Sequence, residues 1–188
     1  MEYLRLPKNQ NPHTKALYEE VFPEDKGAFS DYYYQEVAPE STIYAALLTD
    51  EELVSECVAE GDSEDHASGK AALPAQDKTA LCKEGCVPDG CALEERASGG
   101  IPLEKRICGM IHLNPYTLNW NGERIRIPYI VAVATKERLR HRGIMRHLLE
   151  MIFRDLDRQG VPFAFLMPVS EAIYRPFGFV RTWSWRWE

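Results

Sequence analysis

The chain has 188 residues and a mass of 21.5 kDa, with 45% hydrophobic and 27% charged residues. This length can bury a core without metal or disulfide support, and this composition excludes a wholly disordered, collagen-like or repeat protein. The formal net charge is −7, but 14 of the 29 acidic residues and only 5 of the 22 basic residues lie between positions 50 and 105. The acidity belongs to that segment, so the net charge says little about a binding site elsewhere in the chain.

The first 48 residues predict two strands with two helices between them. Residues 3–6 alternate apolar and polar side chains before Pro7, which is typical of a short strand. Apolar side chains at helical spacing predict helices over 12–22 and 29–37, each followed within two residues by a proline. The apolar run 42–48 then predicts a second strand.

The next segment, residues 50–105, loses this periodicity and is rich in Gly, Ser, Ala, Asp and Glu. Such a composition cannot bury enough apolar surface to order itself, so we expect a polar, flexible insertion within a single domain spanning 1–188. Its cysteines Cys82, Cys86 and Cys91 have spacings that match no compact zinc finger. We therefore expect free thiols and no metal site.

The chain carries no membrane or secretion signal that we can identify. Its longest apolar runs fall far short of the roughly 20 residues that a membrane span needs, and Met1 is followed by a polar stretch. Five cysteines are an odd number, which favours reduced thiols. These features predict a soluble cytoplasmic protein that does not bind a membrane.

A hairpin and a long helix dominate the second half. Residues 107–113 alternate along a strand, and Asn121-Gly122 favours a two-residue turn into a returning strand over 124–133. Apolar residues from Met145 to Leu156 recur at helical spacing and predict an amphipathic helix. Three further elements are expected: a strand over 162–167, a short helix over 170–174 and a strand over 182–187 with three tryptophans on one face. Together these elements predict an α/β domain.

The strand over 129–135 leads into the densest basic cluster of the chain and then into the long helix near Gly143. The cluster comprises five cations: Lys136, Arg138, Arg140, Arg142 and Arg146. Unpaired N–H groups at a helix start, the helix dipole and nearby arginines favour a phosphate, and a glycine lets the anion approach the backbone. The alternative is a solvated basic turn before an ordinary amphipathic helix.

Two motifs resemble those of a known family. Arg140-His141-Arg142-Gly143-Ile144-Met145 is similar to the acetyl-CoA loop of the GCN5-related N-acetyltransferase (GNAT) family, with pattern Gln/Arg-x-x-Gly-x-Gly/Ala. Arg140 and Gly143 fit this pattern, and Met145 departs from it. Ile173-Tyr174-Arg175-Pro176-Phe177-Gly178-Phe179 resembles the family's tyrosine shortly before Gly-Phe. Within the family, these motifs resemble the enhanced-intracellular-survival (Eis) type, where a bulky residue replaces the last glycine.

The resemblance implies a GNAT fold, with a mixed central sheet of about six to seven strands flanked by helices. It also implies an N-acetyltransferase in which an amine attacks acetyl-CoA directly in a ternary complex. Val133 would offer its N–H to the developing oxyanion, and Tyr174 would protonate the departing thiolate. The acetyl-CoA would be bound by Val133, Ala134, Thr135, Arg140, His141, Arg142, Gly143, Ile144, Met145 and Arg146.

The acceptor side is less well defined by the sequence. The resemblance places Tyr32, Tyr33 and Tyr34 beside the acceptor cleft. At helical spacing no more than two of them can share a face, and Tyr32 and Tyr33 are the candidates to contact the acceptor. His112 on a sheet strand is a further candidate, and its alternative is a hydrogen-bonded sheet residue. No general base is assigned, and aminoglycosides, polyamines, lysine side chains and protein N-termini all remain open as acceptors.

Two other function classes and the assembly state stay open. A catalytically silent acyl-CoA-binding module would keep Arg142 and Gly143 without needing Tyr174. A nucleic-acid binder would use the basic cluster and the tryptophans, but no base-reading motif is present, so we expect no nucleic-acid partner. The tryptophan-rich end of the chain suggests a homo-oligomer or a missing C-terminal domain.

Overall fold

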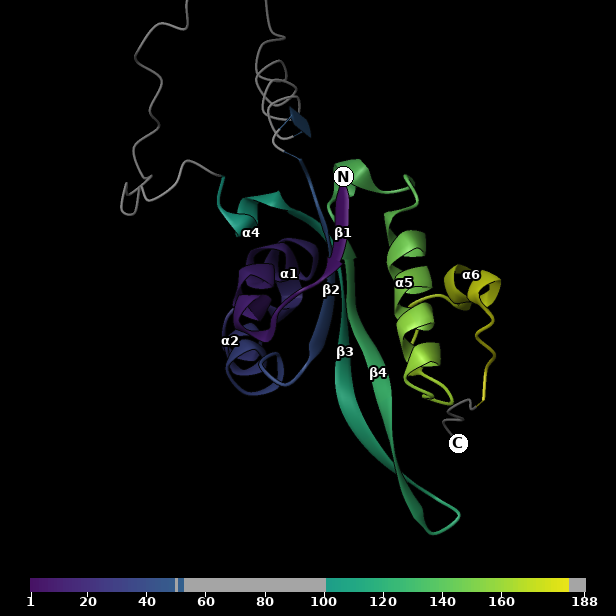
Figure 1. Ribbon diagram of the computed structural model, residues 1–188. Helices are drawn as coiled ribbons and strands as arrows, with labels where there is room; N and C mark the ends of the chain where they lie inside the picture. Colours follow the sequence, from purple (N-terminus) through teal and green to yellow (C-terminus); the bar gives the residue numbers. More distant parts are fainter. Residues whose placement is uncertain (50, 53–100, 183–188) are drawn as a thin grey trace, which may run out of the picture.

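The computed structural model describes residues 1–49, 51–52 and 101–182. Most of the predicted insertion and nearly all of the predicted last strand, 182–187, lie outside these residues. The described part contains a mixed sheet with helices on both faces (Figure 1). This arrangement confirms the α/β class.

One five-stranded sheet runs in the order β1-β2-β3-β4-β5. Its first four strands are antiparallel neighbours, and β5 is parallel to β4. The strands are β1 (Glu2–Arg5), β2 (Thr42–Leu47), β3 (Ile107–Trp120), β4 (Glu123–Thr135) and β5 (Phe165–Leu166). The expected six to seven strands are thus too many for the described residues, and the strand predicted over 162–167 shortens to two residues, since only these pair with β4.

The helices differ in detail from the sequence prediction. The α-helices are α1 (Lys15–Val21), α2 (Ala28–Tyr32), α4 (Leu103–Arg106), α5 (Ile144–Arg158) and α6 (Glu171–Tyr174). Shorter 3₁₀ segments are η1 (Lys8–Thr14), η2 (Pro23–Asp25), η4 (Glu137–Leu139) and η5 (Arg175–Phe177), and η3 (Tyr33–Val37) is a π-helix. The helix predicted over 12–22 is therefore split at Thr14, and α4 corrects the expected end of the insertion at position 105.

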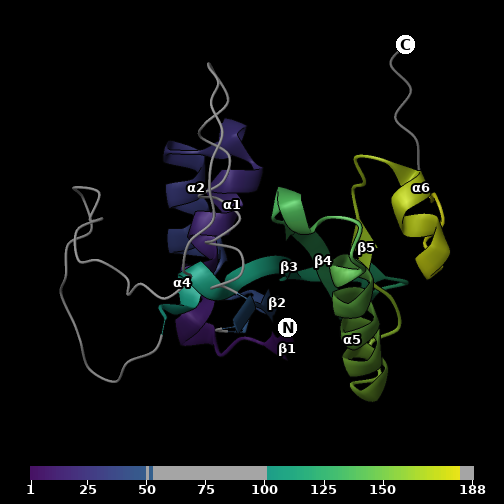
Figure 2. The same cartoon turned by 90° about the horizontal axis from the view of Figure 1, so that it is seen from above.

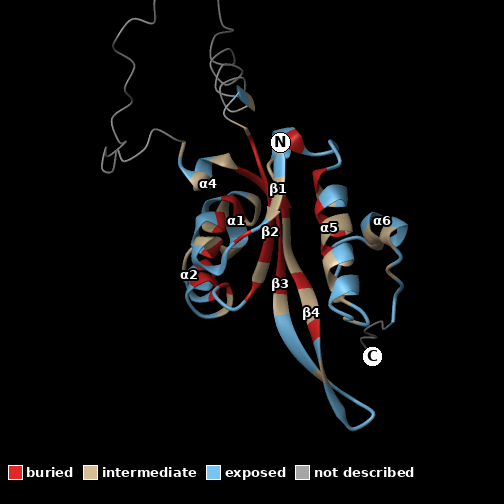
Figure 3. Cartoon of the chain, in the orientation of Figure 1, coloured by how far each residue is buried: buried red, intermediate tan, exposed pale blue. Residues whose placement is uncertain are grey.

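The β3–β4 hairpin closes as its sequence predicts. Trp120 pairs with Glu123, and the two residues between them, Asn121 and Gly122, have φ values of 51° and 89°. Two successive positive φ values define the type I′ turn, which asparagine and glycine tolerate best. In Figure 1 the hairpin extends beyond the other strands, and Figure 3 shows that its far end is exposed.

Two apolar clusters fill the spaces on either side of the sheet. On one face, α1 and the α2–η3 segment pack through Leu17 and Tyr33 onto strand residues such as Ile43. On the other face, Leu148 and Ile152 of α5 belong to a second apolar cluster. Seen from above, the two helical layers lie on opposite sides of the sheet (Figure 2). The predicted amphipathic helix is confirmed as α5.

A close approach fixes the start of α5 against the sheet. A Cβ atom added to Gly109 of β3 would lie only 2.6 Å from Cγ2 of Ile144, the first residue of α5. Ile144 is itself buried. Gly109 is therefore needed for α5 to begin this near to β3.

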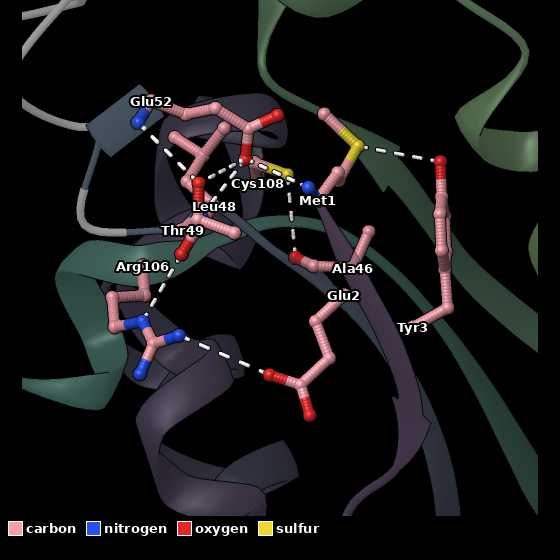
Figure 4. A network of polar contacts seen from close by, with 9 residues as sticks. All are labelled: Met1, Glu2, Tyr3, Ala46, Leu48, Thr49, Glu52, Arg106 and Cys108. Carbon is pink, nitrogen blue, oxygen red and sulfur yellow. Dashed lines mark hydrogen bonds and ion pairs between the residues drawn. The ribbon is translucent and has the colours of Figure 1, made fainter.

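A polar cluster closes the end of the sheet where β2 ends and β3 begins (Figure 4). The Met1 amine lies 2.9 Å from the Glu52 carboxylate, which also accepts hydrogen bonds from the Thr49 N–H and hydroxyl, both at 2.9 Å. The Thr49 backbone hydrogen bond, followed by the Met1 amine, lowers the pKa of Glu52 to about 2. The cluster joins the N-terminus to the residues that follow β2.

Candidate functional site

The N-terminal end of α5 is open to an anion. Gly143 caps the helix in the left-handed region, with φ of 80°, and gives no side-chain hydrogen bond to the first turn. His141 also has a positive φ, 64°. The first N–H groups of a helix, here those of Ile144, Met145 and Arg146, have no carbonyl partner within it, and the helix dipole makes this end positive. A Cβ at Gly143 would meet no protein atom within 4 Å.

The basic cluster surrounds this helix start. Arg138, Arg140, Arg142 and Arg146 are exposed, and Lys136 is half-buried. The Arg140 Nε donates to the Thr135 carbonyl at 3.4 Å, which draws this side chain back toward the end of β4. The Arg146 guanidinium lies over the Phe177 ring, 5.4 Å from its centroid. Positive charge is thus held beside the open N–H groups, a combination suited to a diphosphate.

The strand that leads into this turn has a free edge. β4 pairs with β5 only at Tyr129↔Phe165 and Ile130↔Leu166, although β4 continues to Thr135. Beyond Ile130, the described residues pair with β4 on its β3 side alone. Residues 133–135, which the resemblance assigns to acetyl-CoA binding, lie on this edge, where backbone groups can pair with a ligand.

A β-bulge interrupts β4 just before these residues. Met110 of β3 pairs with Ala134 and His112 pairs with Val131, so one β3 residue faces two β4 residues, Ala132 and Val133. Ala132 has φ of 48°, in the left-handed region. A bulge turns the backbone and side chains of the strand away from their regular directions. The predicted oxyanion donor, Val133, is therefore at a position where the ladder is broken.

Tyr174 lies on the α5 side of the sheet, at the end of α6. Its ring is half-buried, packs against the α5 cluster and meets Phe179 edge to face at 5.8 Å between centroids. Burial raises the pKa of its phenol above the ordinary value of 10.0, so the hydroxyl is protonated at neutral pH. In Figure 1, α6 lies farther from β3 than α5 does.

On the opposite face, His112 and Tyr33 are brought together by buried hydrogen bonds. Tyr33 Oη lies 3.0 Å from His112 Nδ1 and also donates to the Asn114 Oδ1 at 3.0 Å. Thr14 Oγ1 lies 3.4 Å from His112 Nε2 and 2.9 Å from the Tyr34 hydroxyl. Burial lowers the pKa of His112 to about 3 and raises that of Tyr33 to about 12. His112 is therefore neutral at pH 7 and enclosed in this structure.

The predicted acceptor residues thus separate into two groups. His112 and Tyr33 are buried, whereas Tyr32 is 61% exposed on α2 and lies near exposed Phe29 in sequence. The predicted acetyl-CoA residues form one continuous strand, turn and helix start, 133–146. Tyr174 is joined to that group through Phe177, three residues further along the chain, which contacts Arg146.

Two features of this region could not be found from the sequence. The bulge has no signal, since alanine at position 132 does not favour a positive φ. Phe177 was visible only as part of the motif after Tyr174, and nothing in the sequence indicated its contact with Arg146.

The described residues contain neither a metal-ligand group nor a membrane-spanning helix. Across 1–49, 51–52 and 101–182, no group of three or more His, Cys, Asp or Glu side chains is placed to hold a metal ion. Over the same ranges, no helix has both the length and the apolar character that crossing a bilayer requires.

Comparison with known proteins identifies the fold. Residues 92–181 match the family model described as "Acetyltransferase (GNAT) domain". A probable N-acyltransferase from Enterococcus faecalis V583 superposes with a TM-score of 0.59 at 15% identity, covering 94% of this chain and 31% of its own. This chain therefore spans about a third of that protein's length.

Two further solved structures are similar over almost their whole length. AAC(6')-Iy, in complex with the bisubstrate analog CoA-S-monomethyl-acetylneamine, gives a TM-score of 0.56 at 11% identity and covers 100% of this chain and 95% of its own. A predicted acetyltransferase with acetyl-CoA from Clostridium acetobutylicum gives 0.54 at 10%, covering 100% and 94%. No curated protein sequence matches the chain. The expected GNAT fold is confirmed, with five described strands, and residues 92–181 are similar to the GNAT acetyltransferase domain.

Proposed function

We propose that the domain transfers the acetyl group of acetyl-CoA to a primary amine by direct attack within a ternary complex. One observation carries the proposal: the free edge of β4 leads through a bulge into a basic turn and the open start of α5. This continuous surface offers backbone groups to a pantetheine arm and N–H groups with arginines to a diphosphate. The two similar structures that contain acetyl-CoA or a CoA analog support the same donor.

The proposal assigns a chemical role to two of the chain's residues. The amine nitrogen forms a bond to the thioester carbonyl carbon, and the C–S bond breaks as the tetrahedral intermediate collapses. The Val133 N–H stabilises the oxyanion, an effect of about 10²–10³ in rate for one such donor. Tyr174, whose pKa is raised by burial, gives its proton to the leaving sulfur.

Removal of a proton from the amine is a separate requirement. An alkylammonium has a pKa of about 10.4, so free base is scarce at pH 7 and the proton must pass to water or a side chain. We also propose that the domain is of the Eis type, because Arg142-Gly143-Ile144-Met145 is followed by the second motif over residues 170–179. We propose further that the enzyme acts in the cytoplasm on an amine-bearing small molecule or protein, with neither nucleic acid nor membrane as partner, and that it is a homo-oligomer or part of a larger protein.

The test is release of free CoA from acetyl-CoA in the presence of a panel of amines. The panel contains an aminoglycoside, a polyamine, a lysine peptide and a peptide with a free N-terminus. We expect amine-dependent CoA release with at least one of them. Binding of acetyl-CoA without turnover on any amine would support the silent acyl-CoA-binding module, and absence of both would overturn the proposal.

A further inference from the structure

The chain after β5 folds into a small unit that is closed on itself. Glu171, at the start of α6, forms an ion pair with Arg181. Between them, Gly178 has φ of 84° and ends η5, which turns the chain so that Phe179 returns to meet Tyr174. We call residues 171–181 the C-terminal clip. It carries the proposed general acid near one end and two phenylalanines near the other.

The clip touches α5 through both of these phenylalanines. The ring centroid of Phe179 lies 5.9 Å from that of Phe153, a residue in the middle of α5. Phe177 receives the Arg146 guanidinium on its ring face, 5.4 Å from the centroid, in the first turn of the helix. The first contact is purely apolar, whereas the second involves a cation of the proposed phosphate site.

Arg146 can bind a phosphate at the start of α5 only if its side chain points toward that position. It is the third residue of α5, and its side chain is exposed. An exposed arginine samples many rotamers, and ordering it on a ligand opposes binding. A ring face that holds the guanidinium removes part of this cost and leaves the in-plane N–H donors free for phosphate oxygens.

We propose that Phe177 is a positioning residue for the acyl donor: its ring holds Arg146 at the start of α5 for the phosphates of acetyl-CoA. This inference rests on the proposed function, since it assigns a role within the same donor site. Phe177 itself does not touch the reacting atoms. Its effect is on donor affinity and depends on the nucleotide half of the donor.

The experiment compares two acyl donors. Acetyl-CoA carries the diphosphate, whereas acetylpantetheine carries the same thioester without any phosphate. For Phe177→Leu, we expect the Kd and KM of acetyl-CoA to rise about three- to tenfold, with kcat within about twofold of wild type. The KM of acetylpantetheine should not change. Phe177→Tyr keeps an aromatic face and should restore the acetyl-CoA affinity.

Phe179→Leu is the matched control, because it removes a ring from the same clip that contacts Phe153 and Tyr174 but not Arg146. It should leave the ratio of acetyl-CoA to acetylpantetheine affinity at the wild-type value. Arg146→Met should reproduce the effect of Phe177→Leu, and the double variant should lose no more affinity than Arg146→Met alone.

Each outcome decides the inference. Equal losses with both donors, or no loss with acetyl-CoA, overturn it even when the wild-type protein is active. A wild-type protein that neither binds acetyl-CoA nor releases CoA overturns the proposed function instead. If Phe177→Leu does not fold, Phe177→Trp tests the same claim, since the indole is the strongest cation-binding ring and should tighten acetyl-CoA alone; unchanged acetyl-CoA binding then counts against it.

Discussion

On one face of the sheet, the α1–α2 layer is joined to β3 by buried hydrogen bonds as well as by apolar packing. On the other face, α5 packs on the sheet through apolar contacts and a hydrogen bond from Tyr44 to Asp155, and the C-terminal clip contacts α5 through aromatic rings. His112, Tyr33 and Thr14 form the polar connection on the first face. On the second, Phe177 and Phe179 contact α5, and Ile173 and Val180 of the clip are exposed.

This difference indicates which face of the sheet has the more rigid helical layer. A satisfied buried polar network allows few alternative arrangements, because any shift leaves a donor or acceptor without a partner. The clip has ring contacts with α5 in place of such a network, each worth about 0.5–1.5 kcal/mol beyond its buried area. We therefore expect the α1–α2 face to be rigid, and the position of the clip to depend on its few ring contacts.

Removing the Tyr174 hydroxyl should have the largest effect of the changes on the α5 face of the sheet. Tyr174→Phe should lower kcat by a factor on the order of 10²–10⁴, since the sulfur then leaves without a general acid, while acetyl-CoA affinity changes little. Steady-state kinetics and calorimetry measure the two effects. Tyr116→Phe, on the β3–β4 hairpin, is the control and should keep wild-type kcat. Unchanged turnover of Tyr174→Phe would remove its assigned role.

Filling the gap at Gly109 tests how tightly α5 must approach the sheet. Gly109→Ala places a methyl group 2.6 Å from Ile144 Cγ2, so the helix start must move or strain. We expect a loss of roughly 1–3 kcal/mol in unfolding free energy and weaker acetyl-CoA binding. In a double-mutant cycle with Ile144→Ala, which removes Cγ2, the losses should be less than additive. Full additivity would show that this contact does not limit the packing.

The pH dependence of the unfolding free energy tests whether the α1–α2 face keeps His112 buried and neutral. The pKa of His112 is lowered from 6.5 to about 3 by burial, so the folded protein keeps it neutral while the unfolded chain protonates it. This contribution is complete above about pH 6.5 and is lost as the pH falls toward 3. His112→Gln should therefore show a shallower fall in unfolding free energy over that interval. Parallel curves for the two proteins would contradict the buried neutral histidine.

The smallest effect concerns Glu52 at the end of the sheet. Its pKa is lowered from 4.5 to about 2, so its contribution is complete above about pH 4.5 and is lost as the pH falls toward 2. The carboxylate is 39% exposed, so water screens the contact and the contribution is small. Melting temperatures of wild type and Glu52→Gln should differ slightly at pH 7 and converge near pH 2. A difference that persists at pH 2 would rule out the charge as its cause.

Local sequence patterns predicted the elements that local physics determines. The Asn121-Gly122 turn and the amphipathic α5 both appear where expected, because each depends on residues near in sequence. The basic turn before Gly143 was likewise visible, since five cations and a glycine are close together in the chain.

Features set by contacts between distant residues were not predictable in the same way. The bulge at Ala132 depends on the register between β3 and β4, and the shortness of β5 depends on where it leaves β4. The π-helix η3 places both Tyr33 and Tyr34 toward the interior, which ordinary helical spacing did not indicate. The contact between Arg146 and Phe177 joins residues 31 positions apart and is visible only in three dimensions.

The most direct test of the central claim, that the start of α5 binds the diphosphate of acetyl-CoA, is the change in melting temperature on adding acetyl-CoA to wild type and to Gly143→Val. At about 100 times the Kd, the ligand should stabilise the wild-type protein by about 2.7 kcal/mol. A Cβ atom at position 143 would meet no protein atom within 4 Å, but valine is strained at the φ of 80° found there, and its side chain would occupy the space beside the helix N–H groups. We predict a clear rise for wild type and little or none for Gly143→Val. Equal rises in the two proteins, or none in wild type, would contradict the account.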